Sequence, residues 1–572
     1  MSINTKIVAT LGPERSMHDL NDQYRREAVA YADLLPWLVA EGVDVFRLNM
    51  SHRSVSGDRE RSFLDAYRDT RYLWESRARH VAILGDLQGP KIRIGDFLDD
   101  QDATIELQPG DKLVLHTKQQ IVGNEKQVAV LFEGRPFLAM SEHVKKGDQI
   151  WLGDGEALLE VKAVSTRDGS ITCEVRSMAR IKGRRGVTVK DVSFPLESFT
   201  AKDKDDLKLL LSFGAELTYV ALSFVQNAED ILKVKYFIQQ EYEKQGMPAE
   251  EIPVRMPGLI AKIETREAVD NIDEILDVVD GVMVARGDLG MQVGLKDVAR
   301  IQKLLIHKAN VRGKPVITAT QMLDSMERNQ IPTRAEVTDI YNAILDGTDA
   351  IMLSGETSKG PYPIQAVRVM SEVAGHAEKE VASREDRLFN LLREAEASLP
   401  ATQARVSEKK KRLNGRSRQA EFYRQEYLRI HEMLSTQHIT DRISHAACSL
   451  SLGIKVKAII APSTSGQTTR MVSRFRPLVP IVGVVHDYCV ARKLTLCYGV
   501  YPVNILRSYT DNEAIFKAGC DAAKKVKRRS PAMGNATSFE PLIQADDSVV
   551  VTAGYPLFKP GTTNLVKLHL VT

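Results

Sequence analysis

Eight short apolar runs, rich in β-branched residues, alternate with longer helix-like stretches over the first 360 residues. The runs lie at Lys6–Leu11, Val43–Asn49, Val81–Asp86, Tyr219–Phe224, Gly258–Glu264, Gly281–Ala285, Pro315–Thr320 and Ala350–Leu353. Asp297–Arg312 and Ala335–Leu345 are two of the stretches between them. Continuous apolar strands alternating with helices indicate a parallel sheet covered on both faces. Eight such units predict a closed (β/α)8 barrel, in which functional side chains gather at the carboxyl ends of the strands.

The alternation stops after the third run and is replaced by a different pattern. Strand-like runs such as Lys112–His116 and Leu158–Val164 alternate with glycine turns, which predicts a small β-barrel domain, called the lid below, inserted in the larger barrel. Near Lys455 a second series of apolar runs begins, with Val456–Ile460 as its first member. This series predicts a C-terminal doubly wound α/β domain.

These patterns divide the 572 residues into four parts. We expect the catalytic barrel over residues 1–89 and 194–382, the lid over 90–193 and the C-terminal domain over 441–572. The stretch 383–440 is rich in Arg, Lys and Glu. It predicts a charged helical or flexible linker, with an interaction arm as the alternative.

Composition argues against several functional classes. The 78 basic and 75 acidic residues nearly balance, which gives no electrostatic reason to expect a nucleic-acid partner. Five cysteines without zinc-site spacing indicate reduced thiols in a reducing compartment. No apolar stretch approaches the ~18 residues of a membrane span, and the first strand begins at Lys6. We therefore expect a cytoplasmic protein without a membrane anchor or signal peptide.

Charged and hydroxyl side chains stand at the ends of three consecutive barrel strands. Lys262 and Glu264 close one run, Asp288 follows the next, and Thr320 closes the third. Lys262 and Glu264 are two residues apart, so strand alternation places both on one face. Two carboxylates with substrate oxygens are the usual way to hold Mg²⁺. The pattern predicts a divalent-metal site acting on an anionic substrate, with a plain Lys262–Glu264 ion pair as the alternative.

Motifs throughout the barrel, in this order along the chain, resemble those of the pyruvate kinase family. They are Thr5–Pro13, Arg47–His52, Gly85–Arg93, Ala261–Glu264, Val284–Gly290, Ile317–Met326, Pro332–Glu336 and Ile344–Thr357. The resemblance implies phosphoryl transfer from phosphoenolpyruvate to ADP, giving pyruvate and ATP as the last step of glycolysis. It also implies a requirement for Mg²⁺ or Mn²⁺. The lid and the C-terminal domain match the family in position, but weakly in residues.

The resemblance also implies roles for the residues at the strand ends. Glu264 and Asp288 would ligate the metal, while Lys262 would stabilise the phosphoryl group in flight. Arg47 would contact the phosphate of phosphoenolpyruvate. The three residues therefore expected to be catalytic are Lys262, Arg47 and Thr320.

The remaining substrate contacts are implied at two neighbouring strand ends. The backbone amides of Gly287 and Asp288, at the start of a helix or turn, suit the substrate carboxylate. Thr320 is implied near the enolate carbon, where its hydroxyl would relay a proton from water. The alternative for Thr320 is an ordinary β-branched strand residue.

Nucleotide binding is implied at His52, Arg93 and Arg185. Arg185 stands where the family usually has lysine, which keeps the charge but changes the geometry. A second departure is Gly153, where the family commonly has aspartate. The lid is expected to close over the barrel mouth and exclude water.

A monovalent-cation site is implied at Asn49, Ser51, Asp86 and the carbonyl of Leu87. Potassium-dependent members usually have Thr, Lys and Glu where this chain has Leu87, Gln88 and Lys91. An ammonium on Lys91 would supply the positive charge of K⁺ and repel the ion itself. The sequence therefore resembles the potassium-independent branch, and we expect activity without K⁺. The alternative is that Lys91 is a plain surface lysine.

The C-terminal domain carries a hydroxyl-rich turn after its first strand. Ser463, Thr464, Ser465, Gly466 and Thr468 form this turn, and such turns can cradle a phosphate. The resemblance implies that it binds a sugar-phosphate effector and that the enzyme is allosteric. Gly561–Asn564 is a second candidate loop, and ordinary helix capping is the alternative for the first.

The resemblance further implies a homotetramer. Two other functions compete with the pyruvate kinase assignment. One is another Mg²⁺-dependent barrel enzyme acting on pyruvate-like acids, and the other is a non-catalytic scaffold of this fold. A scaffold would be expected to have lost Lys262, Glu264 or Asp288, and all three are present.

Overall fold

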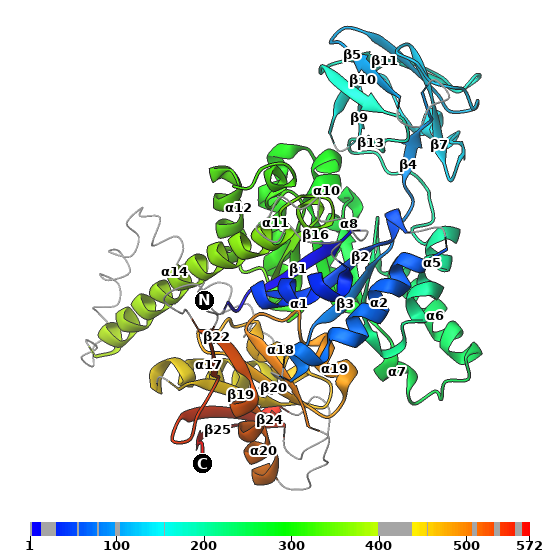
Figure 1. The fold of residues 1–572 in the computed structure, drawn as a ribbon. Coiled ribbons are helices and arrows are strands. Elements are labelled where there is room, and N and C mark those ends of the chain that lie inside the picture. The colour runs from blue at the N-terminus through cyan, green and yellow to red at the C-terminus, as the bar shows by residue number, and fades with distance from the viewer. Residues whose placement is uncertain are drawn as a thin grey trace.

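The computed structural model describes most of the chain in three folded bodies (Figure 1). The described residues are 3–12, 30–53, 56–76, 79–97, 103–153, 155–397, 438–454, 456–505, 512–530, 538–554 and 563–572. The lid lies at one end of the barrel and the C-terminal domain at the other (Figure 1). None of the helices in these ranges is long and apolar enough to span a bilayer.

The barrel is a closed ring of eight parallel strands in the order β1-β18-β17-β16-β15-β14-β3-β2. Its strands are β1 (Lys6–Leu11), β2 (Val43–Asn49), β3 (Ala82–Asp86), β14 (Leu217–Leu222), β15 (Gly258–Ile263), β16 (Gly281–Ala285), β17 (Val316–Ala319) and β18 (Ala350–Leu353). All eight expected runs are strands, and the (β/α)8 barrel is confirmed. Apolar side chains such as Ile260 and Met283 fill the interior, and Leu496 of the C-terminal domain joins that cluster.

Helices form the outer layer of the barrel. They are α1 (Tyr31–Glu41), α2 (Asp58–Thr70), α3 (Tyr72–Glu75), α5 (Ala201–Leu211), α6 (Ala228–Lys244), α7 (Ile252–Arg255), α8 (Arg266–Asp270), α9 (Ile272–Val278), α10 (Arg286–Val293), α11 (Leu295–Val311), α12 (Arg334–Leu345), α13 (Gly355–Ser358) and α14 (Pro363–Ala397). Local sequence fixes several starts: Thr200 and Asp203 form a capping box at α5, and Thr333 and Glu336 form one at α12.

The lid is a mixed β domain with its own apolar core. Its elements are β4 (Ile92–Ile94), β5 (Thr104–Leu107), β6 (Lys112–His116), β7 (Gln127–Phe132), β8 (Arg135–Pro136), α4 (Ala139–His143), β9 (Gln149–Leu152), β10 (Ala157–Ser165), β11 (Ser170–Val175), β12 (Ala179–Lys182) and β13 (Val187–Val189). The main sheet runs β13-β9-β10-β11-β6-β7-β4. A bridge between Arg93 and Gly186 brings its two ends together, so the sheet curls like a small barrel.

The C-terminal domain is an α/β layer structure, as expected. It contains α17 (Ile439–Ile454), β19 (Ala458–Pro462), α18 (Gln467–Ser473), β20 (Ile481–Val485), α19 (Tyr488–Lys493), β21 (Val500–Asn504), α20 (Asn512–Lys525), β22 (Lys527–Ser530), β23 (Ser538–Pro541), β24 (Ser548–Gly554) and β25 (Thr563–Leu570). The sheet order is β21-β20-β19-β24-β25, parallel except for the β25 edge strand. One face packs on α20 and the other on α17, α18 and α19.

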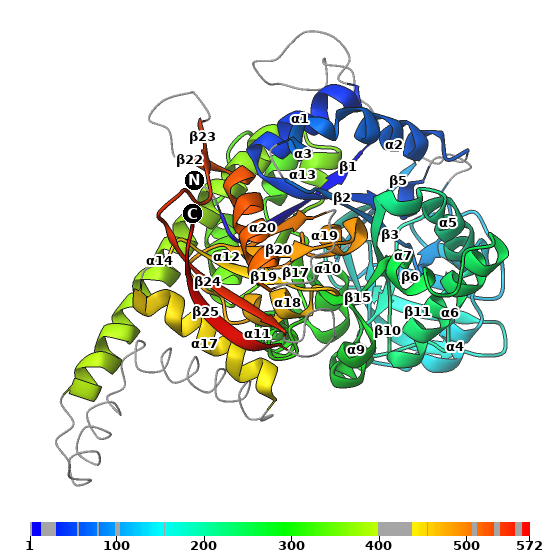
Figure 2. The same cartoon turned by 90° about the horizontal axis from the view of Figure 1, so that it is seen from below.

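The region between barrel and C-terminal domain begins as a continuous helix. The 35 residues of α14 run to Ala397, past the boundary expected at residue 382, and project away from the barrel (Figure 2). Residues 398–437, which hold most of the expected linker, lie outside the described residues. The next described helix, α17, begins at Ile439.

Buried ion pairs join the barrel to the C-terminal domain. Arg476 donates from Nη1 to Asp349 Oδ1 and from Nη2 to Oδ2, both at 2.9 Å, and both side chains are 6% exposed. Asp349 also accepts the Tyr498 backbone N–H at 3.1 Å. A buried carboxylate paired in this way fixes one domain against the other, because removing either partner would leave a buried charge unpaired.

Candidate active site

A chain of charged side chains crosses the barrel rim from β2 to β15. Arg47 donates from Nε to Asp86 Oδ2 at 2.7 Å and from Nη1 to Thr10 Oγ1 at 2.8 Å. Lys262 Nζ lies 3.3 Å from Asp86 Oδ1 and 2.9 Å from Glu264 Oε1. The two carboxylates are 1% exposed and the Lys262 side chain 13%. The structure therefore brings together the lysine and the acid that strand alternation placed on one face.

The loop after β14 supports this network from the neighbouring strand. Ser223 Oγ accepts a hydrogen bond from Lys262 Nζ at 2.7 Å and donates one to the Leu87 carbonyl at 2.7 Å. The Phe224 backbone N–H donates to Glu264 Oε2 at 2.7 Å, and Phe224 has a φ of 54°. A positive φ is uncommon for a bulky residue, and here it aims this N–H at the carboxylate. Sequence reasoning missed Ser223, although a serine at a strand tip was a usable signal.

The charges of the network stabilise one another. Burial alone would lower the pKa of Lys262, but the carboxylates of Asp86 and Glu264 outweigh it and raise that pKa. Burial would raise the pKa of Asp86, but the charges of Lys262 and Arg47 outweigh it and lower that pKa. The lysine therefore stays cationic within the barrel rim, where a charge acts strongly because water is largely excluded.

The charged form of Glu264 is disfavoured by its surroundings. Burial raises its pKa, and the negative charge of Asp288 raises it further, against the opposing effect of Lys262. Asp288 lies in the first turn of α10. Two carboxylates that disfavour each other's charge are a donor set whose repulsion a cation relieves.

The donor set fits a cation that takes part of its shell from substrate. Within the described ranges, no group of three or more His, Cys, Asp or Glu side chains is arranged to hold a metal. Mg²⁺ is commonly bound by one or two carboxylates and completes its octahedral shell with water and substrate oxygens. Glu264 and Asp288 match that requirement, whereas a structural metal site would need more protein ligands.

Thr320 is held in place at the end of β17. Its Oγ1 accepts the Gly287 backbone N–H at 3.0 Å, and its φ is 68°. Arg286 donates from Nε to the Ala319 carbonyl at 3.1 Å and from Nη2 to the Thr320 carbonyl. The Arg286 Nη1 lies 2.6 Å from Asp339 Oδ2. Because a β-branched residue disfavours positive φ, these contacts are what fix the threonine. Arg286 lies in the motif Val284–Gly290, but the sequence analysis assigned it no role.

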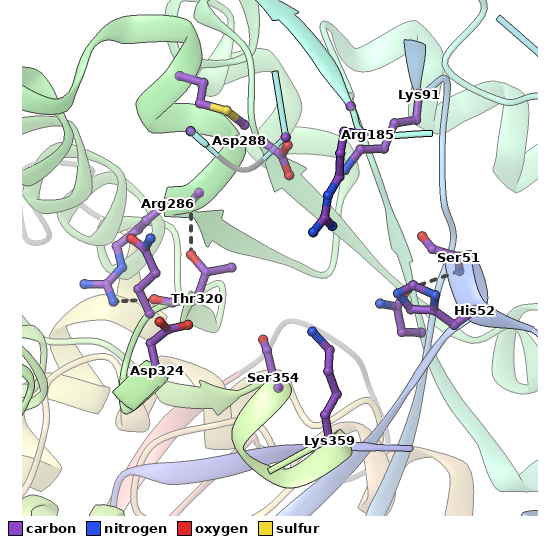
Figure 3. A pocket seen from close by; sticks show the side chains of 18 of the residues that line it. Ser51, His52, Lys91, Arg185, Arg286, Asp288, Thr320, Asp324, Ser354 and Lys359 are labelled. Atoms are coloured by element: carbon purple, nitrogen blue, oxygen red, sulfur yellow. Dashed lines mark hydrogen bonds between the residues drawn. The ribbon is translucent and has the colours of Figure 1, made fainter. Parts of the chain in front are cut away.

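A cleft of about 840 Å³ lies between the barrel rim and the lid. From the barrel it is lined by Arg47, Gly287, Asp288 and Thr320, and Figure 3 shows Thr320, Asp288, Ser354 and Lys359 around it. Its size suits a nucleotide-sized ligand. Four of the five expected substrate-binding residues thus border one cavity, and the fifth, Lys262, contacts Asp86 beside Arg47.

The three residues expected to bind nucleotide all line this cleft. Arg185 Nη2 lies 2.9 Å from Glu156 Oε1, and Arg93 donates from Nη1 to the Arg184 carbonyl at 3.0 Å. Burial lowers the pKa of His52, and the charges of Lys359 and neighbouring arginines lower it further. The cleft is therefore rich in positive charge, as an anionic ligand requires.

The residues expected to form the monovalent-cation site are only partly brought together. Asn49 Oδ1 accepts the Ser51 backbone N–H at 3.1 Å, and Asp86 pairs with Arg47 and Lys262. Lys91 lies by the lid instead: a Cβ built on Gly186 would be 3.8 Å from Lys91 Nζ. Figure 3 shows Lys91 well apart from Ser51. In this arrangement Lys91 has not entered the Asp86 network.

The candidate effector turn follows β19. Gly466 has a φ of 77°, and exposed Thr464 and Ser465 precede it. Thr468 is buried and shares a 2.7 Å hydrogen bond with Thr563 of the second candidate loop. The two loops expected from sequence are thus neighbours, although Gly561 and Thr562 lie outside the described residues.

Comparison with known proteins gives matches along nearly the whole chain. Residues 2–367 match the family model described as "Pyruvate kinase, barrel domain", and residues 441–569 match "Pyruvate kinase, alpha/beta domain". A pyruvate kinase of Thermotoga maritima is 36% identical over 99% of both chains. One of Geobacillus stearothermophilus is 35% identical, covering 100% of this chain and 81% of the relative. The crystal structure of a pyruvate kinase from Cryptosporidium parvum superposes with a TM-score of 0.75 at 28% identity, covering 100% of this chain and 96% of that one.

Proposed function

Because this chain belongs to the pyruvate kinase family of phosphotransferases, we propose that it transfers phosphate from phosphoenolpyruvate to ADP with the help of Mg²⁺. The observation that carries this assignment is the buried contact of Lys262 with Asp86 and Glu264 beside the cleft. Phosphoryl transfer depends mainly on positioning and on neutralising spread negative charge. A cation held rigidly beside two acids supplies both.

Lys262 and Arg47 act on the phosphoryl group. The Lys262 ammonium is kept charged by its carboxylate neighbours and oriented by Ser223, so it stabilises charge that develops on the equatorial oxygens during transfer. The Arg47 guanidinium is fixed by Asp86 and Thr10, which prepares its free face for the substrate phosphate. Neither group needs to reorganise when the substrate arrives.

Thr320 and Gly287 act at the other end of the substrate. The Gly287 N–H occupies one lone pair of Thr320 Oγ1, so the hydroxyl hydrogen is free to point into the cleft. A threonine is too weak an acid to protonate an enolate alone, so it passes on a proton supplied by water. The nearby α10 terminus offers backbone N–H groups to the substrate carboxylate.

Glu264 and Asp288 are the residues that would hold Mg²⁺. When bound, the ion would supply positive charge that neutralises the developing negative charge of the substrate. The two carboxylates of this chain would hold the ion, and Glu264 is 1% exposed. Another barrel enzyme on pyruvate-like acids would need the same ion, but would have no use for the cationic cleft beneath the lid.

We also propose that the enzyme is active without K⁺. It requires Lys91 to swing from beside Gly186 toward Asn49, Ser51, Asp86 and the Leu87 carbonyl, which closure of the lid would allow. The role of Lys91 can be tested with Lys91→Glu, which removes the ammonium and should make the enzyme dependent on K⁺. If the unaltered enzyme is inactive until K⁺ is added, this proposal fails while the phosphotransferase assignment stands.

Binding and assembly proposals follow from the family. His52, Arg93 and Arg185 would contact ADP or ATP, and the turn 463–468 would take a sugar phosphate as an allosteric effector. We also propose a homotetramer, which the family supports, and a cytoplasmic location, which the family and the five buried cysteine thiols support.

The decisive experiment measures pyruvate formed from phosphoenolpyruvate and ADP by the full chain. Turnover requiring both substrates and Mg²⁺ supports the proposal. Replacing Lys262 by Met should lower kcat by roughly 100- to 1000-fold, the usual cost of removing one transition-state contact. Lys233→Met, at an exposed position of α6, is the matched control. Absence of turnover in the unaltered chain, with the fold intact by circular dichroism, would favour the scaffold alternative.

A further inference from the structure

A second hollow, of about 510 Å³, lies where the lid joins the barrel. The start of α5 at Ala201 and Lys202 forms its barrel wall, while Leu131 and Phe132 of β7 form its lid wall. The catalytic cleft is bounded instead by Trp151 of β9 and by α10. Figure 1 shows β7 and α5 on one side of β4, with β9 and α10 on the other. This rear hollow therefore lies behind the segment that carries the lid.

Three cationic side chains, Lys91, Arg93 and Arg184, line both the cleft and the rear hollow. Arg184 is neutralised by Asp96, with contacts of 2.7 and 2.9 Å. Arg93 donates to the Arg184 carbonyl. In the described part of the chain, no carboxylate lies within ion-pair distance of the Lys91 ammonium. Lys91 is thus a half-buried charge, without a counter-charge, between two cavities.

The walls of the rear hollow indicate the kind of ligand it would take. Leu131 and Phe132 give it an apolar side, and the Lys91 ammonium and Arg93 guanidinium give it a cationic side. Two carboxylates also line the hollow: Asp96 is neutralised by Arg184, and exposed Glu133 lies in the turn after β7. An organic carboxylate with a compact apolar body satisfies both, because the ring or chain is removed from water while the carboxylate pairs with the ammonium. Inorganic anions would leave the apolar wall uncovered.

We propose that the rear hollow binds a small organic carboxylate, and that the bound carboxylate holds the Lys91 ammonium away from the catalytic cleft. The coupling rests on the proposed function of Lys91 as the substitute for K⁺. One ammonium cannot pair with a carboxylate in the rear hollow and also replace K⁺ in the catalytic cleft. A ligand in the rear hollow therefore competes with the active position of Lys91. Occupying the hollow therefore inhibits the enzyme, and K⁺ relieves that inhibition by supplying the missing charge.

The test uses phthalate, an aromatic dicarboxylate, with the full chain at saturating phosphoenolpyruvate, ADP and Mg²⁺. Without K⁺, phthalate should lower the rate by about fivefold or more, which is the lower range of coupling between sites. Ala201→Trp fills the hollow and Gln120→Glu adds a repelling charge at its edge. Either should abolish the inhibition, measured relative to each variant's own rate. Ala249→Trp, on an exposed turn remote from the hollow, should keep it.

Several results would overturn the proposal. They are absence of inhibition by phthalate at saturating substrates, inhibition unchanged in both hollow variants, and inhibition that K⁺ leaves undiminished. Calorimetry with phthalate distinguishes binding at the rear hollow from the role of Lys91. Binding that Ala201→Trp abolishes, in an enzyme that nevertheless needs K⁺, would establish the hollow as a site while refuting the role of Lys91. Absence of binding in an enzyme active without K⁺ would refute the hollow alone.

Discussion

Replacing Arg286 by Met should impair proton transfer at Thr320 more than substrate binding. The Arg286 side chain is 9% exposed, and its guanidinium donates to the carbonyls of Ala319 and Thr320. These two bonds hold Thr320 at a φ of 68°, where its Oγ1 meets the Gly287 N–H. Without them the threonine is free to relax toward negative φ, and its hydroxyl leaves the position that faces the cleft.

The expected size of the effect follows from the two hydrogen bonds that Arg286 donates to the end of β17. A hydrogen bond from a charged donor contributes about 1.5–3 kcal/mol. Losing that free energy in the positioning of Thr320 lowers the rate of proton transfer by roughly 10- to 100-fold. Arg286 touches no reacting atom, so it is a positioning residue, and the KM for phosphoenolpyruvate should change little.

The assay compares two rates in the same preparations. Exchange of the pyruvate methyl hydrogens with deuterated water reports proton transfer, and pyruvate formation reports the whole reaction. Asp339→Asn is the matched control, because it removes the partner charge of Arg286 but leaves both backbone contacts. Exchange within about twofold of the parent rate in Arg286→Met would refute this reasoning, as would a raised KM with unchanged kcat.

Three other perturbations have expected outcomes. Glu264→Gln should weaken Mg²⁺ binding by about tenfold or more, seen by calorimetry, because one of two carboxylate ligands is removed; equal affinity in both proteins would argue against this ligand. Asp349→Ala should destabilise the barrel–C-terminal interface by about 3–5 kcal/mol, because it leaves Arg476 buried without a counter-charge; an unchanged first unfolding midpoint in urea would contradict that. Burial, aided by Arg492, lowers the pKa of His80 to about 4. The contribution of neutral His80 to the free energy of unfolding is therefore complete above pH 6.5 and is lost as the pH falls toward 4. At pH 5 the loss should be about 2 kcal/mol relative to His80→Phe, and parallel acid profiles of the two proteins would exclude it.

The barrel and the position of its reactive rim could be predicted from the amino-acid sequence. Apolar periodicity was sufficient for the strands, because a buried parallel strand needs apolar residues on both faces. Gly281–Ala285 and Val43–Asn49 appear with the expected bounds. Lys262 and Glu264 could also be placed together, because alternation along one strand fixes their common face.

The groups that support that rim became visible only in the folded protein. Ser223 and Arg286 act through contacts with residues 39 and 34 positions away, and no local pattern encodes a pairing of that separation. The same holds for Lys91: its sequence position suggested the Asp86 network, yet the packing of the lid places it beside Gly186. Strand identity is a local property of the chain, whereas the partner of a charged side chain depends on how separate strands and domains close around it.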